Sequence, residues 1–209
     1  MLVLKIKKPS SPEDIEDVFS QLPKTKIANV NWVKEFPYKP DVKFAIFHDG
    51  DSIYLRYQVD EQHTLARMGA DNGEVWKDSC VEFFIALDDS GYYNFEFNSL
   101  GKGLVGFRQD RNTVVHGDDA VLSKISRQGT MGSSPFEERD DQTWELTLTI
   151  PKDAFFKHNL KTLTGIKARA NFYKCGDDLT IPHFVSWKPI DNPTPNFHLP
   201  KFFGELEFV

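Results

Sequence analysis

The stretch VWKDSCVEFFIAL, residues 75–87, decides how the chain can fold. From Val81 onward nearly every residue is apolar or aromatic and Glu82 is the only charge, so the run predicts a central strand buried along most of its length. A tryptophan, a lysine and an aspartate, residues 76–78, stand immediately before it. This order places a flat aromatic surface and hydrogen-bonding groups at one end of a sheet.

Two tight reversals, one before and one after this run, predict hairpins. Residues 49–51, Asp-Gly-Asp, separate the strand-like residues 42–48 from residues 52–59, and an Asp-Gly pair supplies the positive φ angles of a tight turn. Residues 88–91, Asp-Asp-Ser-Gly, lead into residues 92–98, where aromatic and polar side chains alternate. The central strand is therefore expected to pair with the strand that follows it.

The other segments add one short helix and further strands. Residues 11–21 begin with a serine, a proline and two acids and carry spaced apolar residues, which predicts a helix. Residues 143–150 alternate strongly and predict a strand, and residues 202–208 predict the last one. Residues 60–74 and 129–141 are polar and lack an apolar period, so they are expected to be loops.

Size and composition fit a fold of many short strands. A chain of 209 residues and 24.0 kDa with 40% hydrophobic residues can bury a sizeable core, and all-β sandwiches often reach this length. Most of the 18 phenylalanines lie in short runs bounded by turn residues. The sequence therefore predicts an all-β fold, an antiparallel two-sheet β-sandwich of jelly-roll or immunoglobulin-like type with one or two short helices, in one domain over residues 1–209.

The charge balance restricts the partners. A formal net charge of -6 and a pI near 5.5 argue against nucleic acid or an anionic membrane, because either would require a basic face. A neutral ligand fits better. Residues 1–8 contain too short an apolar run, interrupted by lysines, for a signal peptide or a membrane span, so a complete chain of this kind is expected in the cytoplasm. The oligomeric state stays open.

Cysteines and acidic pairs give little sign of a cofactor. Cys80 and Cys175 both lie in strand-like runs, and two thiols alone form neither a disulfide framework nor a zinc site, so buried free thiols are expected. Acidic pairs such as residues 88–89 and 177–178 can supply oxygen ligands to a structural Ca2+, although aspartate is also an ordinary turn residue. Structural calcium is therefore one alternative, and no other cofactor is indicated.

The four tryptophans divide into two kinds. Trp32 and Trp144 lie within apolar alternation and are expected in the core. Trp76 and Trp187 have polar neighbours, so each can stand at the end of a sheet. An indole presents a broad apolar face to the C–H groups of a pyranose, and such stacking is worth roughly 0.5–1.5 kcal/mol per ring. Sugar binding and burial in the core are equally open for this second pair.

Three charged or titratable residues are candidates for contacts to a sugar. Glu82 in an apolar strand is costly unless it is paired or hydrogen-bonded, so it has either a cationic partner in the fold or a ligand. Hydrogen bonds between sugar hydroxyls and charged groups, which Glu82 accepts and Lys77 donates, are worth about 1.5–3 kcal/mol each. His198, between apolar residues, is either a structural side chain or a ligand contact.

The signals of catalysis are weak. A glycosidase needs two carboxylates at a defined separation, and the chain has many acids, among them Asp78, Glu82, Glu96 and Asp191. No nucleophile elbow, metal-type histidine spacing or glycine-rich phosphate loop after a strand occurs. A glycoside hydrolase or hydrolase-associated domain with paired carboxylates is the main alternative to binding without chemistry.

Several segments together resemble the family 9 carbohydrate-binding modules and their DOMON-like relatives. They are DGDSIYL at 49–55, WKDSCVEFF at 76–84, YYNFEFN at 92–98, WKP at 187–189, FHLP at 197–200 and FGEL at 203–206. The pattern Trp-x-Asp-Ser-x-x-Glu is the most specific part, and the resemblance is weakest over residues 108–141.

The resemblance implies an antiparallel β-sandwich in which two tryptophans clamp a sugar ring, often at a reducing end, with structural calcium in some members. Trp76 matches the first clamp residue and Glu82 the carboxylate, while Trp187 is the candidate for the second clamp residue. Such modules usually accompany glycoside hydrolases in polysaccharide catabolism. The residues predicted to bind a mono- or oligosaccharide are Trp76, Trp187, Glu82, Lys77, Asn98, Arg108 and His198.

Two further alternatives stay open. The DOMON-like relatives suggest a haem-binding redox module, which would need an axial pair, yet none of Met1, Met68 and Met131 stands beside a histidine at a strand end. An interaction domain without a sugar is favoured if Trp76 and Trp187 are both buried.

Overall fold

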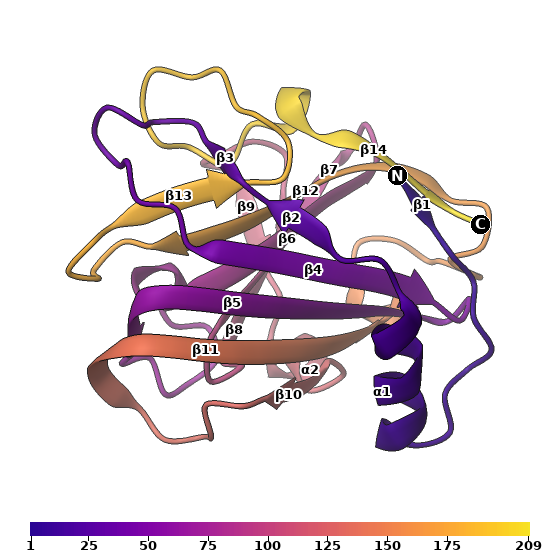
Figure 1. Ribbon diagram of the computed structural model, residues 1–209. Helices are drawn as coiled ribbons and strands as arrows, with labels where there is room; N and C mark the ends of the chain where they lie inside the picture. The colour runs from indigo at the N-terminus through magenta and orange to yellow at the C-terminus, as the bar shows by residue number, and fades with distance from the viewer.

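Two β-sheets pack face to face in the computed structural model, which describes residues 1–209 (Figure 1). One sheet has the strand order β1 (Leu2–Val3), β14 (Gly204–Phe208), β12 (Lys167–Gly176), β6 (Cys80–Asp88), β7 (Gly91–Asn98), β8 (Gly103–Arg108) and β9 (Val114–His116), and β13 (His183–Ser186) pairs with β12 and with β3 (Asn29–Val30). The second sheet has the order β10 (Ser126–Gly129), β11 (Phe136–Pro151), β5 (Ser52–Ala66), β4 (Asp41–His48) and β2 (Thr25–Ile27).

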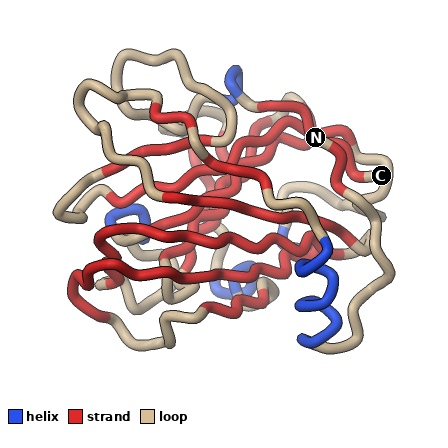
Figure 2. The backbone as a smooth tube through the Cα atoms, viewed as in Figure 1, coloured by secondary structure: helices blue, strands red, loops and turns tan.

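The predicted fold class is confirmed. All named strand pairs are antiparallel except β1 with β14, where the two ends of the chain lie side by side. Helices are short and lie at the margins of the sheets (Figure 2): α1 (Pro12–Gln21), α2 (Asp119–Leu122) and the 3-10 turns η1 (Val75–Lys77), η2 (Lys152–Ala154) and η3 (Pro200–Phe202). None of the helices has the length and apolar character needed to cross a bilayer.

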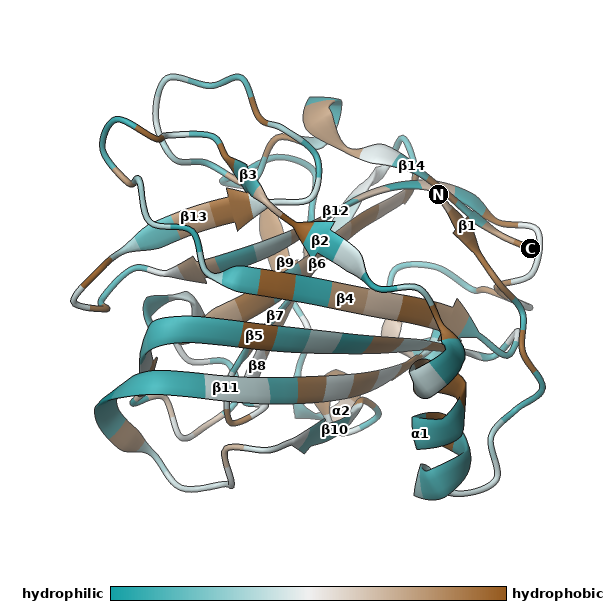
Figure 3. Ribbon diagram, viewed as in Figure 1, coloured by the Kyte–Doolittle hydropathy of each residue, from teal (hydrophilic) through white to brown (hydrophobic).

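The predicted helix and the two predicted hairpins are confirmed. The expected helix is α1, and the Ser11 hydroxyl accepts the backbone N–H of Asp14 at 3.2 Å as its N-cap. Gly50 adopts a φ of 99° in the hairpin between β4 and β5. The second hairpin joins β6 to β7. Banding by hydropathy along β4, β5 and β11 shows the period-two alternation of half-buried strands (Figure 3).

The central strand β6 is buried on both faces. Its residues Val81, Phe83 and Ile85 lie in the main core between the two sheets, together with Trp144. Its residues on the other face, among them Phe84, belong to a second apolar cluster. The segments 31–40 and 187–203 cover this second cluster. They contribute the side chains of Trp32, Ile190, Phe197 and Phe203 to it. We call the side of the nine-stranded sheet that bears this cluster the outer face.

Two segments expected to be loops are partly strand. β5 continues through residues 60–66 and β11 begins at Phe136, so the predictions of loops were wrong for residues 60–66 and 136–141 and right for residues 67–74 and 130–135. The physical reason is that polar residues of β5 point inward. Glu61 and Thr64 are buried, and such residues hide the apolar alternation by which a strand is recognised.

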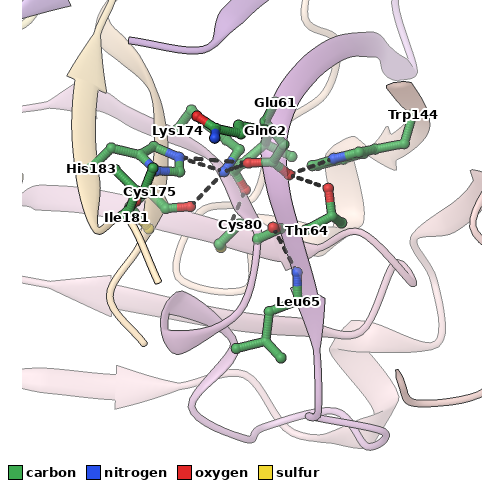
Figure 4. A network of polar contacts seen from close by, with 12 residues as sticks. Glu61, Gln62, Thr64, Leu65, Cys80, Trp144, Lys174, Cys175, Ile181 and His183 are labelled. Atoms are coloured by element: carbon green, nitrogen blue, oxygen red, sulfur yellow. Dashed lines mark hydrogen bonds and ion pairs between the residues drawn. The ribbon is translucent and has the colours of Figure 1, made fainter. Parts of the chain in front are cut away.

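A buried polar network makes this inward polar face possible (Figure 4). The Glu61 carboxylate forms an ion pair with the Lys174 ammonium at 2.7 Å, and both side chains are fully buried. The Trp144 indole N–H donates to Glu61 at 2.7 Å, and the Thr64 hydroxyl donates at 3.1 Å. Lys174 also contacts His183 Nε2 at 2.8 Å. Burial and the Lys174 charge hold the pKa of His183 well below its usual range, so the imidazole is a neutral acceptor.

Candidate functional site

A cleft of about 310 Å³ opens on the outer face. Alternate residues of β6, β7 and β8 form its floor because side chains at period two share one face of a sheet. Its walls come from η1, β13 and the segment before η3. The lining residues used below are Trp76, Glu82, Glu96, Arg108, Phe184, Phe197 and His198.

Aromatic side chains form the walls of the cleft. Trp76 is half-buried, and it packs on the second apolar cluster. Phe197 stacks on Tyr173, with centroids 4.1 Å apart and planes at 9°. Phe184 packs on Phe197 at 6.2 Å and 70°. These supports hold the walls in place, while Trp76 and Phe184 keep part of their surface accessible.

Two carboxyl groups lie on the floor. Glu82 of β6 and Glu96 of β7 are directly opposite each other in the antiparallel register, and each is only 3% exposed. Side chains opposite one another on one face have Cβ atoms roughly 4.5–5.5 Å apart. Neither carboxyl group has a lysine, arginine or histidine nitrogen within the 4.0 Å of an ion pair, so two carboxyl groups face each other without a cation.

The environment of the two carboxyl groups favours their protonated forms. Burial raises the pKa of Glu82 well above its usual range, and the charge of Glu96 raises it further. Burial also raises the pKa of Glu96 to about 7, against a smaller lowering by the hydrogen bond from Asn94. At neutral pH the pair can therefore both donate and accept hydrogen bonds. That combination suits hydroxyl groups, which also do both.

Two consecutive hydrogen bonds link Glu96 on the floor of the cleft to Arg108 at its rim. Asn94 Nδ2 donates to Glu96 Oε1 at 2.8 Å, and Arg108 Nε donates to Asn94 Oδ1 at 3.0 Å. Arg108 Nη1 donates to the Arg111 carbonyl at 2.6 Å, which fixes the guanidinium at the end of β8. Arg108 thus presents a positioned cation to the cleft.

His198 is a neutral group on the wall. Its Nδ1 lies 3.1 Å from the Tyr92 hydroxyl, and its ring packs on Phe84 at 5.0 Å. Burial lowers the pKa of His198 to about 3, and the charges of Arg108 and Arg111 contribute to this lowering.

The structure brings together four of the seven residues predicted from the sequence. Trp76, Glu82, Arg108 and His198 all line the cleft. Lys77 does not line it: its ammonium pairs with Glu74 at 2.7 Å at the surface.

Asn98 holds a loop rather than lining the cleft. Its Nδ2 donates to Asp78 Oδ2 at 2.8 Å and to the Met68 carbonyl at 2.9 Å, and its Oδ1 accepts the backbone N–H groups of Leu100 and Lys102. Asp78 also accepts the backbone N–H groups of residues 67 and 68. The aspartate of the Trp-x-Asp-Ser pattern is therefore a structural residue that positions the segment before β6.

Trp187 lies away from Trp76. Its indole packs edge-on against Phe44 at 6.2 Å and Phe172 at 5.6 Å, both members of the main core. The Lys188 ammonium lies 4.2 Å from the centre of its ring. Trp187 follows the last residue of β13, and the side chain that β13 gives to the cleft is Phe184.

Sequence reasoning did not single out several lining residues. Glu96 was only one acid among many, and Phe184, Phe197, Asp177 and Cys175 were not candidates for contacts to a sugar. A signal for Glu96 existed, because it alternates with Asn94 on the polar face of residues 92–98. The contribution of Phe184 and Phe197 depends on long loops whose course no period predicts.

Three aspartates of the acidic pairs along the chain, Asp49, Asp88 and Asp118, accept backbone N–H groups in turns. Asp49 Oδ1 accepts the N–H groups of Asp51 and Ser52, and Asp118 Oδ1 accepts that of Val121. Calcium takes about 6–8 oxygen ligands. The one group of three or more ligating side chains is Cys80, Glu82 and Cys175, which offers two sulfur atoms. These residues do not fit calcium.

Comparison with known proteins identifies the family. The sequence model of carbohydrate-binding family 9 matches residues 13–208. The chain belongs to carbohydrate-binding family 9. No curated protein matches the chain.

Solved structures agree with this membership. A candidate carbohydrate-binding protein from Bacteroides uniformis ATCC 8492 is 40% identical, with a TM-score of 0.95 over 100% of this chain and 98% of that one. Family 9 modules from Caldicellulosiruptor kristjanssonii were solved with glucose (13% identity, TM-score 0.64, 100% and 96% coverage) and with cellotriose (13%, 0.65, 100% and 92%). At that identity the likeness to the two modules shows the fold alone.

Proposed function

We propose that the cleft on the outer face binds one ring of a mono- or oligosaccharide and leaves it uncleaved. The observation that carries this proposal is the pair of facing carboxyl groups, Glu82 and Glu96, buried without a cation beside an accessible indole. A protein keeps such a costly arrangement where a ligand supplies the missing hydrogen bonds.

The aromatic contact in this proposal is made by Trp76. A pyranose ring lies against its exposed face, and Phe184 and Phe197 form the wall in the role first given to Trp187. Trp187 packs against Phe44 and Phe172 instead, so we assign it to the stability of the sandwich.

Polar contacts then select for hydroxyl groups. Glu82 and Glu96 donate or accept at the floor, and Arg108 donates from the rim. Each hydrogen bond with a charged partner is worth about 1.5–3 kcal/mol when it forms. One stack and two or three such bonds, less the cost of association, correspond to dissociation constants from about micromolar to millimolar. Glucose and cellotriose are the first ligands to test, since related modules were solved with them.

Calorimetric titration with cellotriose tests the proposal. Trp76→Ala is expected to weaken binding about tenfold, the value of one lost stack. Trp187→Phe is the matched control, and it is expected to bind like the unsubstituted chain. Equal affinity of Trp76→Ala and the unsubstituted chain would show that the sugar does not bind against Trp76.

A role beside a glycoside hydrolase in carbohydrate catabolism follows as part of the same proposal. The chain would then supply binding, and a partner enzyme would supply hydrolysis. Cosedimentation with insoluble polysaccharides of different backbones identifies which material the chain recognises.

Hydrolysis by the chain itself is the second candidate, favoured by one observation. Glu82 and Glu96 face each other, and retaining glycosidases place their two carboxyl groups about 5–5.5 Å apart. Against it, burial raises the pKa of both carboxyl groups, which disfavours the ionised form that a nucleophile needs. Release of a chromophore from aryl glycosides that is abolished in Glu82→Gln would establish this activity.

A further inference from the structure

Beneath the cleft two cysteines face each other across neighbouring strands. Cys80 of β6 is directly opposite Cys175 of β12 in the antiparallel register, so both thiols lie on the outer face. The two sulfur atoms and one Glu82 carboxylate oxygen all lie within 4.8 Å of one another, and Cys175 Sγ is 3.1 Å from Glu82 Oε1. Cys80, Cys175 and Glu82 are 0%, 2% and 3% exposed.

These three groups are weakly satisfied within the protein. The Cys80 thiol lies 3.7 Å from the Val81 carbonyl and otherwise interacts with the Cys175 thiol. Cys175 points to the Trp76 carbonyl at 3.5 Å and to Glu82. A thiol is a weak donor, so Glu82 gains little from this bond and has no cation beside it. Three potential ligands are thus buried together without strong partners.

We propose that Cys80, Cys175 and Glu82 form a binding site for a thiophilic divalent cation such as Zn2+. Two sulfurs and a carboxylate oxygen are a ligand set that zinc accepts, at about 2.3 Å for sulfur and about 2.0–2.2 Å for oxygen. Calcium and magnesium prefer oxygen alone. Cys175 and Glu82 line the cleft, so a cation can reach the site from there.

Binding releases protons to the solvent. Both thiols lose their S–H protons when the two sulfur–metal bonds form, and the Glu82 carboxyl loses its proton if it carries one. Affinity therefore falls as pH is lowered. No oxidant or reductant takes part.

Zinc titration of the reduced, full-length chain against a chromogenic chelator tests the site. One Zn2+ per chain is expected. Cys80→Ser and Cys175→Ser each are expected to weaken binding more than about a hundredfold, beyond the roughly 10–100-fold cost of losing an outer-shell contact. No zinc binding by the unsubstituted chain overturns the proposal.

His63 provides the matched control, because it pairs with Asp140 at 2.8 Å and lies 3.5 Å from Glu138 near the surface, where zinc could bind adventitiously. His63→Gln is expected to leave the affinity unchanged. Loss of binding in His63→Gln with retention in the cysteine variants contradicts the site.

Cobalt(II) supplies a measurement that needs no variant. Cobalt bound at this site shows a thiolate-to-metal charge-transfer absorption, and stoichiometric cobalt binding without that absorption overturns the proposal. Both titrations are made without sugar, so their outcome is separate from that of the proposed carbohydrate binding.

Discussion

Buried glutamates lie on both faces of the nine-stranded sheet, and they differ in whether the protein provides them with a cation. On the inner face, Glu61 has the Lys174 ammonium at 2.7 Å and the Trp144 indole N–H at 2.7 Å. On the outer face, Glu82 and Glu96 face each other without a cation and line an open cleft. The inner carboxylate has a cation within the protein, and the outer pair has none.

This difference separates a structural role from a binding role. A buried ion pair that is fully hydrogen-bonded contributes little net stability, but removing one partner is costly. A buried pair of like groups lowers stability unless protons or a ligand compensate it. The same residue type, glutamate, therefore serves the sandwich on one face and the proposed sugar site on the other.

Lys174→Met should have the largest effect, because it leaves the Glu61 carboxylate buried without its cation. We expect a loss of about 3–5 kcal/mol in the free energy of unfolding, measured by urea denaturation. Adding Glu61→Gln to this variant should recover much of the lost free energy of unfolding. If Lys174→Met alone is as stable as the unsubstituted chain, the inner group is not an obligate pair.

Glu96→Gln should increase stability at alkaline pH. The pKa of Glu96 is raised to about 7 from an ordinary value of 4.5, so its contribution to stability is present below pH 4.5 and is lost as pH rises through 7. The amide avoids that loss, which is worth up to about 3 kcal/mol near pH 8 and vanishes near pH 4. Urea denaturation at the two pH values measures the difference. An equal effect at both would show that ionisation is not the cause.

Asn98→Ala tests whether Asn98, which was predicted from the sequence to bind the sugar, has a structural role instead. Asp78 and the Met68 carbonyl lose a donor, and two backbone N–H groups lose an acceptor, so a loss of about 2 kcal/mol in stability is expected. The affinity of the folded protein for cellotriose should be unchanged. A selective loss of affinity without a loss of stability would return Asn98 to the site.

The smallest effect is expected for Lys77→Met. Its ammonium pairs with Glu74 at the surface, so calorimetry should detect no more than about a twofold change in sugar affinity. Arg108→Met is the companion variant at the rim, and it should weaken binding by roughly tenfold or more. The reverse order of these two variants would move the basic contact from β8 to η1.

The fold could be predicted from the sequence wherever a strong local signal determined the structure. The Asp-Gly turn at residues 49–51, the capped helix α1 and the apolar run of β6 each carry a local signal that packing did not overrule. The second half of β5, residues 60–66, was not predicted because its inward residue Glu61 is stabilised by Lys174, which lies 113 positions later (174 − 61). No local pattern reports such a partner.

Part of the cleft lining could be predicted from the sequence. Trp76, Glu82, Arg108 and His198, four of the predicted ligand contacts, line the cleft. Trp187 shows the limit, because a change of one strand position decides which face a side chain occupies. The sequence cannot reveal that β13 gives Phe184 to the cleft while Trp187 joins Phe44 in the main core.

The indole N–H resonances of the four tryptophans test the central claim most directly, since one NMR titration with glucose observes all four rings. Trp144 and Trp32 donate to Glu61 and to the Asn192 carbonyl, and Trp187 packs in the sandwich. With each signal assigned from a single Trp→Phe variant, we expect a saturable shift of the Trp76 signal alone. A shift of the Trp187 signal with that of Trp76 unmoved would contradict it.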